Sequence, residues 1–135
     1  MVSIITPAYN AESYLTETVR SVQSQTFDDF EMLIVDDDST DDTAEIAKRF
    51  AAEDPRIRLI RQANAGPSAA RNTAIEQARG EYLALLDSDD LWMHTYLADQ
   101  LAILAAHPDV DVVSANAFNL GGPHDGEPSA SACSS

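Results

Sequence analysis

Short apolar runs that alternate with longer amphipathic segments constrain the fold of this 135-residue chain more than any other feature. The runs have the length and the β-branched content of buried strands, whereas the segments between them carry apolar residues at helical spacing. Strands that alternate with helices form a mainly parallel sheet with helices on both faces, so we expect a three-layer α/β fold. The expected strands are 2–6, 30–35, 57–60, 81–86 and 110–115. The expected helices are 11–24, 68–78 and 93–106, together with a helix that starts after the capping residues 39–41 and reaches residues 50–51.

Four residues set the expected boundaries of these elements. Pro7 ends the first strand because proline cannot donate to a ladder, and Asn10 caps the helix that follows. Pro67 stands at the first position of the third helix, where its fixed backbone is tolerated. Gly80 ends that helix as the residue after the cap, where glycine adopts a left-handed conformation at little cost.

Carboxylates follow two of the expected strands directly. Asp87, Asp89 and Asp90 come after the apolar run 82–86, and residues 36–38 are three aspartates after the second strand. Ionised carboxylates this close repel one another unless a cation lies between them, and their hard oxygens suit Mg²⁺ or Mn²⁺. The alternative for each cluster is a solvated acidic turn that caps the next helix.

The carboxyl ends of parallel strands lie at one edge of a sheet, so the two acidic clusters are expected to meet there. In a doubly wound sheet that meeting point is near the switch in strand order, where such folds bind ligands. Two groups of carboxylates from distant parts of the sequence therefore predict one shared crevice.

Composition limits the partners and the compartment of the chain. The formal net charge of −15 makes the chain a poor nucleic-acid binder, and an anionic ligand would need a metal, an arginine or a helix N-terminus for local attraction. The single cysteine, Cys133, permits no intrachain disulfide, and the N-terminus lacks the pattern of a signal peptide. We expect a cytoplasmic protein, with peripheral association at the inner face of the membrane as an alternative.

Four segments together resemble family 2 glycosyltransferases, which have the GT-A nucleotide-sugar-binding fold. The resemblance covers about residues 2 to 115, in the order and spacing of the family. The segments are Val-Ser-Ile-Ile-Thr-Pro-Ala-Tyr-Asn at 2–10, Val-Asp-Asp-Asp-Ser at 35–39, Asn-Ala-Gly-Pro-Ser-Ala-Ala-Arg-Asn at 64–72 and Leu-Asp-Ser-Asp-Asp at 86–90.

The resemblance implies roles for nucleotide-binding residues at the first two strand ends and on the third helix. Thr6, Pro7 and Tyr9 would line the base pocket, with Tyr9 stacked on the base or else packed in the core. Asp37 would accept a hydrogen bond from the imide of a uracil, since an ionised carboxylate only accepts. Arg71 would approach the diphosphate or else pair with one of the acidic clusters.

The acidic segment matches the Asp-x-Asp motif of that family. By resemblance, Asp87 and Ser88 face the ribose, and a later carboxylate binds the metal that bridges the diphosphate. Asp89 is the favoured metal ligand, with Asp90 beside it as the alternative.

The resemblance implies metal-dependent transfer of a sugar, with inversion, from a nucleotide-diphosphate donor (a UDP-sugar is favoured) to a hydroxyl acceptor of unknown identity. The family's general base lies beyond the expected fifth strand, so we expect this chain to hold only the donor-binding half, in a domain at 1–118, followed by a low-complexity tail at 119–135. Its catalytic residue is therefore unknown.

An apolar sheet edge left uncovered would favour a homo-oligomer.

Three other classes of protein fit parts of the sequence. A non-catalytic nucleotide or nucleotide-sugar-binding module would share all four motifs. A receiver domain also gathers aspartates at strand ends, but its late lysine is missing, since no lysine follows Lys48. A dinucleotide-binding domain needs a glycine-rich turn after the first strand, where this chain has Pro-Ala-Tyr-Asn.

Overall fold

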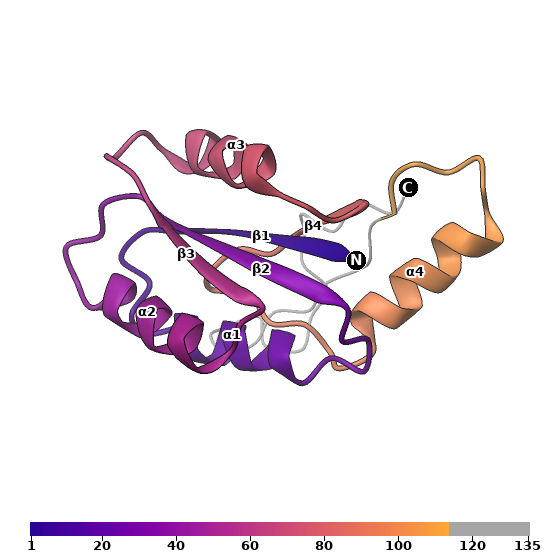
Figure 1. The fold of residues 1–135 in the computed structure, drawn as a ribbon, viewed down its shortest axis with the longest axis horizontal. Helices are drawn as coiled ribbons and strands as arrows, with labels where there is room; N and C mark the ends of the chain where they lie inside the picture. Colours follow the sequence, from indigo (N-terminus) through magenta and orange to yellow (C-terminus); the bar gives the residue numbers. More distant parts are fainter. Residues whose placement is uncertain (114–135) are drawn as a thin grey trace, which may run out of the picture. The chain divides into compact units, whose positions relative to one another are not determined.

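The structure, a computed structural model, describes residues 1–113, which belong to two compact units. The first unit is Met1–Thr95, and the described part of the second unit is residues 96–113. Elements of the predicted type follow one another in the predicted order (Figure 1). The first unit contains β1 Val2–Ala8, α1 Leu15–Gln23, β2 Phe30–Asp36, α2 Thr43–Glu53, β3 Ile57–Arg61, α3 Pro67–Gln77 and β4 Tyr82–Leu85, and the second unit contains α4 Tyr96–Ala106.

The four strands form one sheet in the order β3–β2–β1–β4, and every neighbouring pair is parallel. Helix α3 covers one face of the sheet, and α1 and α2 lie on the other (Figure 1). Every residue of β1 and of β2 is buried, because helices cover both faces of these central strands. The predicted three-layer, parallel α/β fold is confirmed.

Small residues on α3 let this helix pack closely against the sheet. Ala70 and Ala74 are fully buried, and they form a core cluster with apolar side chains of β1 and β2. An alanine brings the helix backbone near the strands, as the sequence predicts for this alanine-rich segment. The sheet residues of this cluster are Ile5, Leu33 and Val35.

Strand β1 continues through Pro7 to Ala8, so the predicted end at Pro7 is wrong. Successive residues of a strand direct their backbone groups to alternate neighbours. The carbonyl of Ala8 accepts from Asp37 on the β2 side, whereas the carbonyl of Ile5 accepts from Leu86 on the β4 side. The position of Pro7 therefore faces the β4 side beyond the end of that strand, where the missing N–H costs no ladder bond.

The predicted helix start at Ala11 with a cap at Asn10 is also wrong. Helix α1 begins at Leu15, after a turn in which the backbone N–H groups of Tyr14 and Leu15 donate to the carbonyl of Ala11. Asn10 has a φ of 48°, and its side-chain oxygen accepts from the backbone N–H of Thr40 at 2.9 Å. A contact between two loops, rather than local capping, determines the conformation of Asn10.

Gly80 does not have the predicted left-handed conformation. Helix α3 ends at Gln77, and Ala78 follows it with an extended backbone. The only described glycine with positive φ is Gly66, which precedes α3. A Cβ atom on Gly80 would lie 2.7 Å from the backbone of both Met1 and Ser3. The position requires glycine because two parts of the backbone approach each other closely.

The fourth helix begins at Tyr96 rather than at the predicted Met93. The residues before it are bonded to Gln25 and Thr26, which follow the end of α1. The carbonyl of Met93 accepts from the side-chain amide of Gln25 at 2.7 Å, and the carbonyl of His94 accepts from the backbone N–H of Thr26 at 2.8 Å. A helix that started at Met93 would need these two carbonyls as acceptors for its own backbone hydrogen bonds.

Two other predictions concern the end of the chain. Residues 110–113 of the predicted fifth strand have no regular secondary structure, and the remainder of that strand lies outside the described residues. The predicted boundary at residue 118 and the tail at 119–135 also lie outside them. No helix within residues 1–113 is both long and apolar enough to cross a bilayer.

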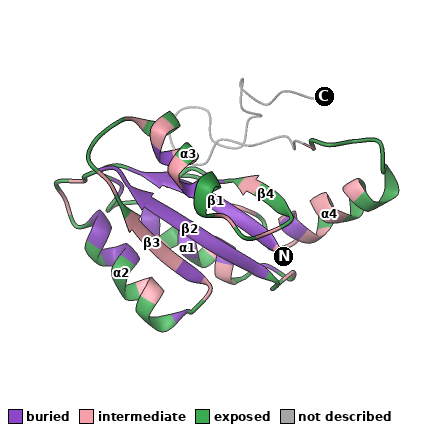
Figure 2. Ribbon diagram, turned by 45° about the horizontal axis from the view of Figure 1, so that its top comes forward, coloured by how far each residue is buried: buried purple, intermediate pink, exposed green. Residues whose placement is uncertain are grey.

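Strand β4 is an edge strand with an exposed apolar surface. Tyr82, Leu83 and Leu85 are 44%, 50% and 60% exposed, in contrast to the fully buried neighbour β1 (Figure 2). An apolar strand edge is a surface on which another strand can pair. This edge agrees with the expectation of an uncovered sheet edge.

Candidate donor-binding site

A cavity of about 630 Å³ lies beyond the carboxyl ends of β1, β2 and β4. The strand order reverses here, because β2 and β3 extend the sheet from one side of β1 and β4 lies on the other side. This is the place where open α/β sheets bind ligands. The residues that line the cavity are Pro7, Ala8, Tyr9, Asn10, Ala11, Tyr14, Asp37, Asn64, Gly66, Pro67, Ala70, Arg71, Asp87, Ser88 and Asp89.

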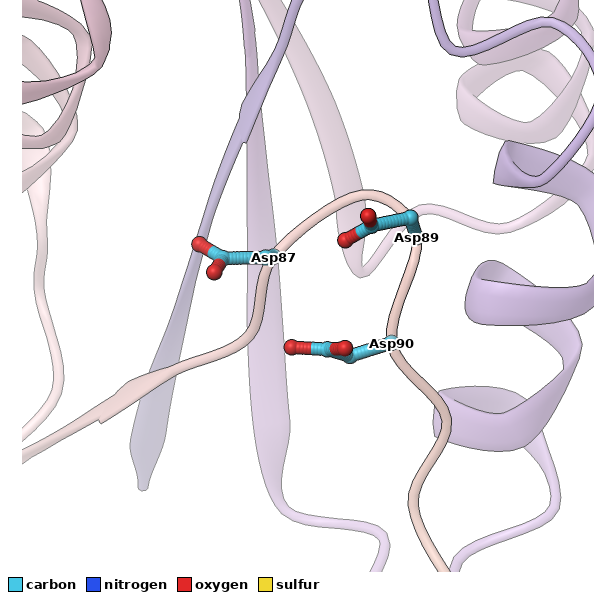
Figure 3. Close-up of side chains that lie close together, drawn as sticks. All are labelled: Asp87, Asp89 and Asp90. Atoms are coloured by element: carbon cyan, nitrogen blue, oxygen red, sulfur yellow. The ribbon is translucent and has the colours of Figure 1, made fainter. Parts of the chain in front are cut away.

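The loop after β4 brings three carboxylates together at one side of this cavity. Asp87, Asp89 and Asp90 are exposed, and each offers a carboxylate oxygen within 4.8 Å of the others (Figure 3). The backbone N–H of Asp90 donates to the carbonyl of Asp87 at 3.1 Å, which closes the turn. The buried side chain of Leu86 fixes the start of the loop in the core.

The electrostatics of these carboxylates fit a divalent cation. Partial desolvation of the Asp90 carboxyl group, together with the negative charges of Asp89 and Asp87, raises its pKa. A raised pKa means that the ionised state is disfavoured as the loop stands. Three hard oxygen donors with an unrelieved negative charge are suited to Mg²⁺ or Mn²⁺. We therefore regard the donor set as compatible with the predicted metal.

Asp37 lies on the other side of the cavity, beyond the end of β2. It is buried, and both of its carboxylate oxygens accept hydrogen bonds from the segment before α3. One oxygen accepts from the Gln62 amide at 2.9 Å and from the Ala65 N–H at 2.8 Å, and the other accepts from the Gly66 N–H at 2.9 Å. These hydrogen bonds, that from Gln62 foremost, lower the pKa of Asp37, so the group is a carboxylate at neutral pH.

Arg71 supplies a positive charge in this acidic cavity. It projects from α3, and its guanidinium lies 3.1 Å from a carboxylate oxygen of Asp87. Both side chains are partly exposed, so the pair is open to solvent and to a ligand. The structure thus contains the pairing that the sequence left open as the alternative to a diphosphate contact.

The structure gathers most of the predicted site residues around the same cavity. Asp37 and Asp87, which come from separate strand ends, both line it, and so do Pro7, Arg71, Ser88 and Asp89. Tyr9 also lines it and is 52% exposed, which excludes the alternative that Tyr9 is a core residue.

Two predicted site residues are not among the lining residues of the cavity. Thr6 is fully buried, and its hydroxyl has no hydrogen-bond partner among the described residues. Asp90 belongs to the carboxylate cluster but does not line the cavity, whereas Asp89 does both.

Sequence reasoning missed two contributors to the site. Gln62 supports Asp37, and it also accepts from the hydroxyl of Thr73 on α3, at 2.7 Å. Tyr14 lines the cavity from the turn before α1 and is 57% exposed. An exposed tyrosine in an apparent helix carries no local signal of a site, and only the late start of α1 brings it there.

Comparison with known proteins places this fold in one class. TarS of S. aureus, solved as residues 1–349 with UDP-GlcNAc, matches with a TM-score of 0.71 and 36% identity over 79% of this chain and 32% of that chain. The mannosyltransferase PcManGT of Pyrobaculum calidifontis, solved with GDP-Man and Mn²⁺, matches with a TM-score of 0.69 and 28% identity over 92% of this chain and 36% of that chain. The parallel sheet and its likeness to these structures therefore define a GT-A glycosyltransferase domain.

The family follows from the sequence comparisons. The sequence pattern of glycosyl transferase family 2 matches residues 3–131. TuaG of Bacillus subtilis, provisionally named as a teichuronic acid biosynthesis glycosyltransferase, is 46% identical over 105 residues, which are 77% of this chain and 42% of TuaG. The glycosyltransferase GlyG of Streptococcus pneumoniae serotype 4 is 38% identical over 120 residues, 88% of this chain and 40% of GlyG. The chain belongs to glycosyl transferase family 2, and it spans about two fifths of the length of these relatives.

Proposed function

We propose that this chain forms the donor-binding part of an inverting, metal-dependent glycosyltransferase, which moves a sugar from a nucleoside-diphosphate donor to a hydroxyl acceptor. The observation that carries the proposal is that Asp37, Arg71 and the acidic loop line one and the same cavity. A buried carboxylate can bind a nucleobase, a guanidinium can bind a diphosphate, and a cluster of oxygen ligands can bind a divalent cation. The neighbours solved with UDP-GlcNAc and with GDP-Man and Mn²⁺ support it.

The nucleobase end of the donor lies near Asp37 in this proposal. A carboxylate offers roughly four acceptor positions, and the chain itself uses three of those on Asp37. One position is left for a donor such as the imide N–H of uracil, and the family resemblance is what favours a UDP-sugar. Tyr9, exposed on the cavity wall, offers a ring face on which a base can stack.

The diphosphate end of the donor lies near the acidic loop. Asp89, with Asp87 or Asp90, would hold Mg²⁺ or Mn²⁺. When bound, such a cation stabilises the negative charge that develops on the leaving diphosphate. Arg71 exchanges its contact with Asp87 for one with a phosphate oxygen, since a guanidinium binds phosphates as readily as carboxylates.

Titration with nucleotides tests this proposal. We expect UDP to bind with Mn²⁺ and to bind much more weakly without it, and we expect Asp89→Asn to lose the Mn²⁺-dependent part. Asp28→Asn is the matched control, because it removes an equal charge just before β2, at the opposite end of the sheet from the cavity. Equal UDP binding with and without Mn²⁺, unchanged in Asp89→Asn, would contradict the proposal. GDP in the same titration tests the preference for uridine.

A non-catalytic nucleotide-sugar-binding module is the second candidate function. It is favoured by one observation, namely that the carboxylates lining the cavity, Asp37, Asp87 and Asp89, are all used by the proposed nucleobase and cation contacts, which leaves none of them to activate an acceptor hydroxyl. Mixing the chain with UDP-GlcNAc, Mn²⁺ and alcohol acceptors tests the binding module. Turnover that Asp89→Asn abolishes would refute it, whereas Mn²⁺-dependent binding without turnover is expected of a binding module and also of a donor-binding part that lacks the general base.

A further inference from the structure

One face of α1 holds the backbone of the segment that contains and follows the acidic loop. Thr18 and Ser21 lie three residues apart, so they share a side of the helix, and Gln25 lies two residues beyond its end. The Thr18 hydroxyl lies 2.9 Å from the carbonyl oxygen of Ser88 and 2.8 Å from that of Asp90. The Ser21 hydroxyl accepts from the Trp92 N–H at 3.3 Å, and the side-chain amide of Gln25 donates to the carbonyl of Met93.

Thr18 is the member of this face that touches the acidic loop itself. Its side chain is fully buried, and its hydroxyl has a single hydrogen, which the carbonyls of Ser88 and Asp90 share. A threonine in a helix has few accessible rotamers, so the hydroxyl occupies a fixed position. Two carbonyls drawn to that position hold the chain on both sides of Asp89 in a tight turn.

This turn determines where the three carboxylates point. The Asp90 N–H bond to the Asp87 carbonyl and the two carbonyl bonds to Thr18 together fix residues 87–90. With no cation present, three carboxylates within 4.8 Å of one another repel and would open the loop. A buried hydroxyl that grips the backbone opposes that opening without offering a ligand of its own.

We propose that Thr18 is a positioning residue for the cation, which preorganises Asp87, Asp89 and Asp90 by holding the backbone between them. This inference rests on the proposed function, because it takes the acidic loop to be the metal site. Groups that orient metal ligands commonly change affinity by roughly tenfold or more when they are removed.

The first experiment measures Mn²⁺ affinity by electron paramagnetic resonance of the free ion. Thr18→Val keeps the shape of the side chain and removes the hydroxyl, and we expect it to weaken Mn²⁺ binding about tenfold. Thr18→Ser keeps the hydroxyl and is expected to restore most of the affinity. Ser3→Ala is the matched control, because it removes another fully buried hydroxyl, at the amino end of β1, which serves Glu31 and Gly80.

The second experiment needs no metal. Hydrogen exchange of the Asp90 amide should become faster in Thr18→Val, with the amides of β2 unchanged. If Thr18→Val and Ser3→Ala lower the melting temperature alike and leave Mn²⁺ affinity alone, Thr18 has only a structural role and the inference is overturned. Unchanged exchange at Asp90 overturns it as well. If the Asp90 amide exchanges faster in Thr18→Val but the wild-type chain binds no Mn²⁺, both the proposed function and the role of Thr18 in positioning a cation site are refuted.

Discussion

Replacing Gly80 tests whether a close approach or a left-handed turn requires glycine between α3 and β4. A Cβ atom at this position would lie 2.7 Å from three atoms, namely the Met1 carbonyl oxygen, the Ser3 backbone nitrogen and the Ser3 hydroxyl oxygen. Two of these belong to the backbone at the start of β1, a central strand, so they cannot swing away. The Gly80 N–H also donates to the Ser3 hydroxyl at 2.8 Å, and that hydroxyl donates to Glu31 at 2.7 Å.

Three terms set the size of the expected effect of Gly80→Ala. Forcing extra volume into a packed region costs about 1–3 kcal/mol. Weakening the bond to the Ser3 hydroxyl adds about 1 kcal/mol. Loss of chain entropy in the unfolded state opposes these by roughly 0.4–1 kcal/mol. We expect a net loss of about 2 kcal/mol in the free energy of unfolding, or a fall of about 10 °C in the melting temperature.

Urea unfolding of a small set of variants measures this effect and identifies its cause. A left-handed position tolerates asparagine better than alanine, whereas a crowded position penalises the larger side chain. We therefore expect Gly80→Asn to be at least as destabilising as Gly80→Ala. Gly66→Ala is the control for backbone strain, because Gly66 has a φ of 95° and an added Cβ would meet nothing within 4 Å.

A double-mutant cycle completes the test. Ser3→Ala removes one of the three crowded atoms, so its effect should couple with that of Gly80→Ala and add independently to that of Gly66→Ala. A Gly80→Asn variant that is more stable than Gly80→Ala would refute the reasoning, and so would strict additivity between the changes at Ser3 and Gly80.

Three further predictions concern charge and association. Hydrogen bonds from Arg56 lower the pKa of Asp54 to about 2, so Asp54 contributes about 2 kcal/mol to the free energy of unfolding at neutral pH, and this contribution is lost as the pH falls toward that value. Urea unfolding of Asp54→Asn should show reduced stability at pH 7 and a flatter acid dependence. An unchanged acid dependence would contradict this. Because the pKa of Asp90 is raised, Mn²⁺ affinity should begin to weaken on acidification at a pH above about 3.9, the pKa of an unperturbed aspartate. Calorimetry that shows no such weakening in the wild type, or weakening that begins at the same pH in Asp90→Asn, would count against this prediction. The exposed β4 edge should support self-association at high micromolar concentration, which Leu83→Lys or Leu85→Lys should reduce in sedimentation, while a monomeric wild type would exclude it.

The class of the fold and the place of the site were accessible from local patterns. Buried runs such as 30–35 predicted the central strands, because a strand covered on both faces is mostly apolar. The position of Asp37 and Asp87 directly after strands predicted a shared cavity, since parallel strands end at one edge of a sheet. These predictions depend only on the order of residues along the chain and on the geometry of parallel sheets.

Two of the predictions that were wrong concern residues whose partners are distant in sequence. Asn10 was expected to cap a helix, but its acceptor oxygen serves Thr40, 30 residues away. Gly80 was expected to end a helix, but its neighbour Ser3 is 77 residues away. Capping rules describe what a residue does when no stronger contact competes, and in both cases a tertiary contact did.

The amino-acid sequence by itself determined the order of strands and helices, the parallel sheet and the carboxylates at its edge, because hydrophobic periodicity is a local property of a chain. Only the tertiary structure decided what holds these carboxylates. The bond from Asp37 to the Gly66 N–H spans 29 residues, and the bond from Thr18 to the carbonyl of Asp90 spans 72. Such bonds form between groups that the packing of helices on the sheet brings together, and no local pattern in either segment encodes them.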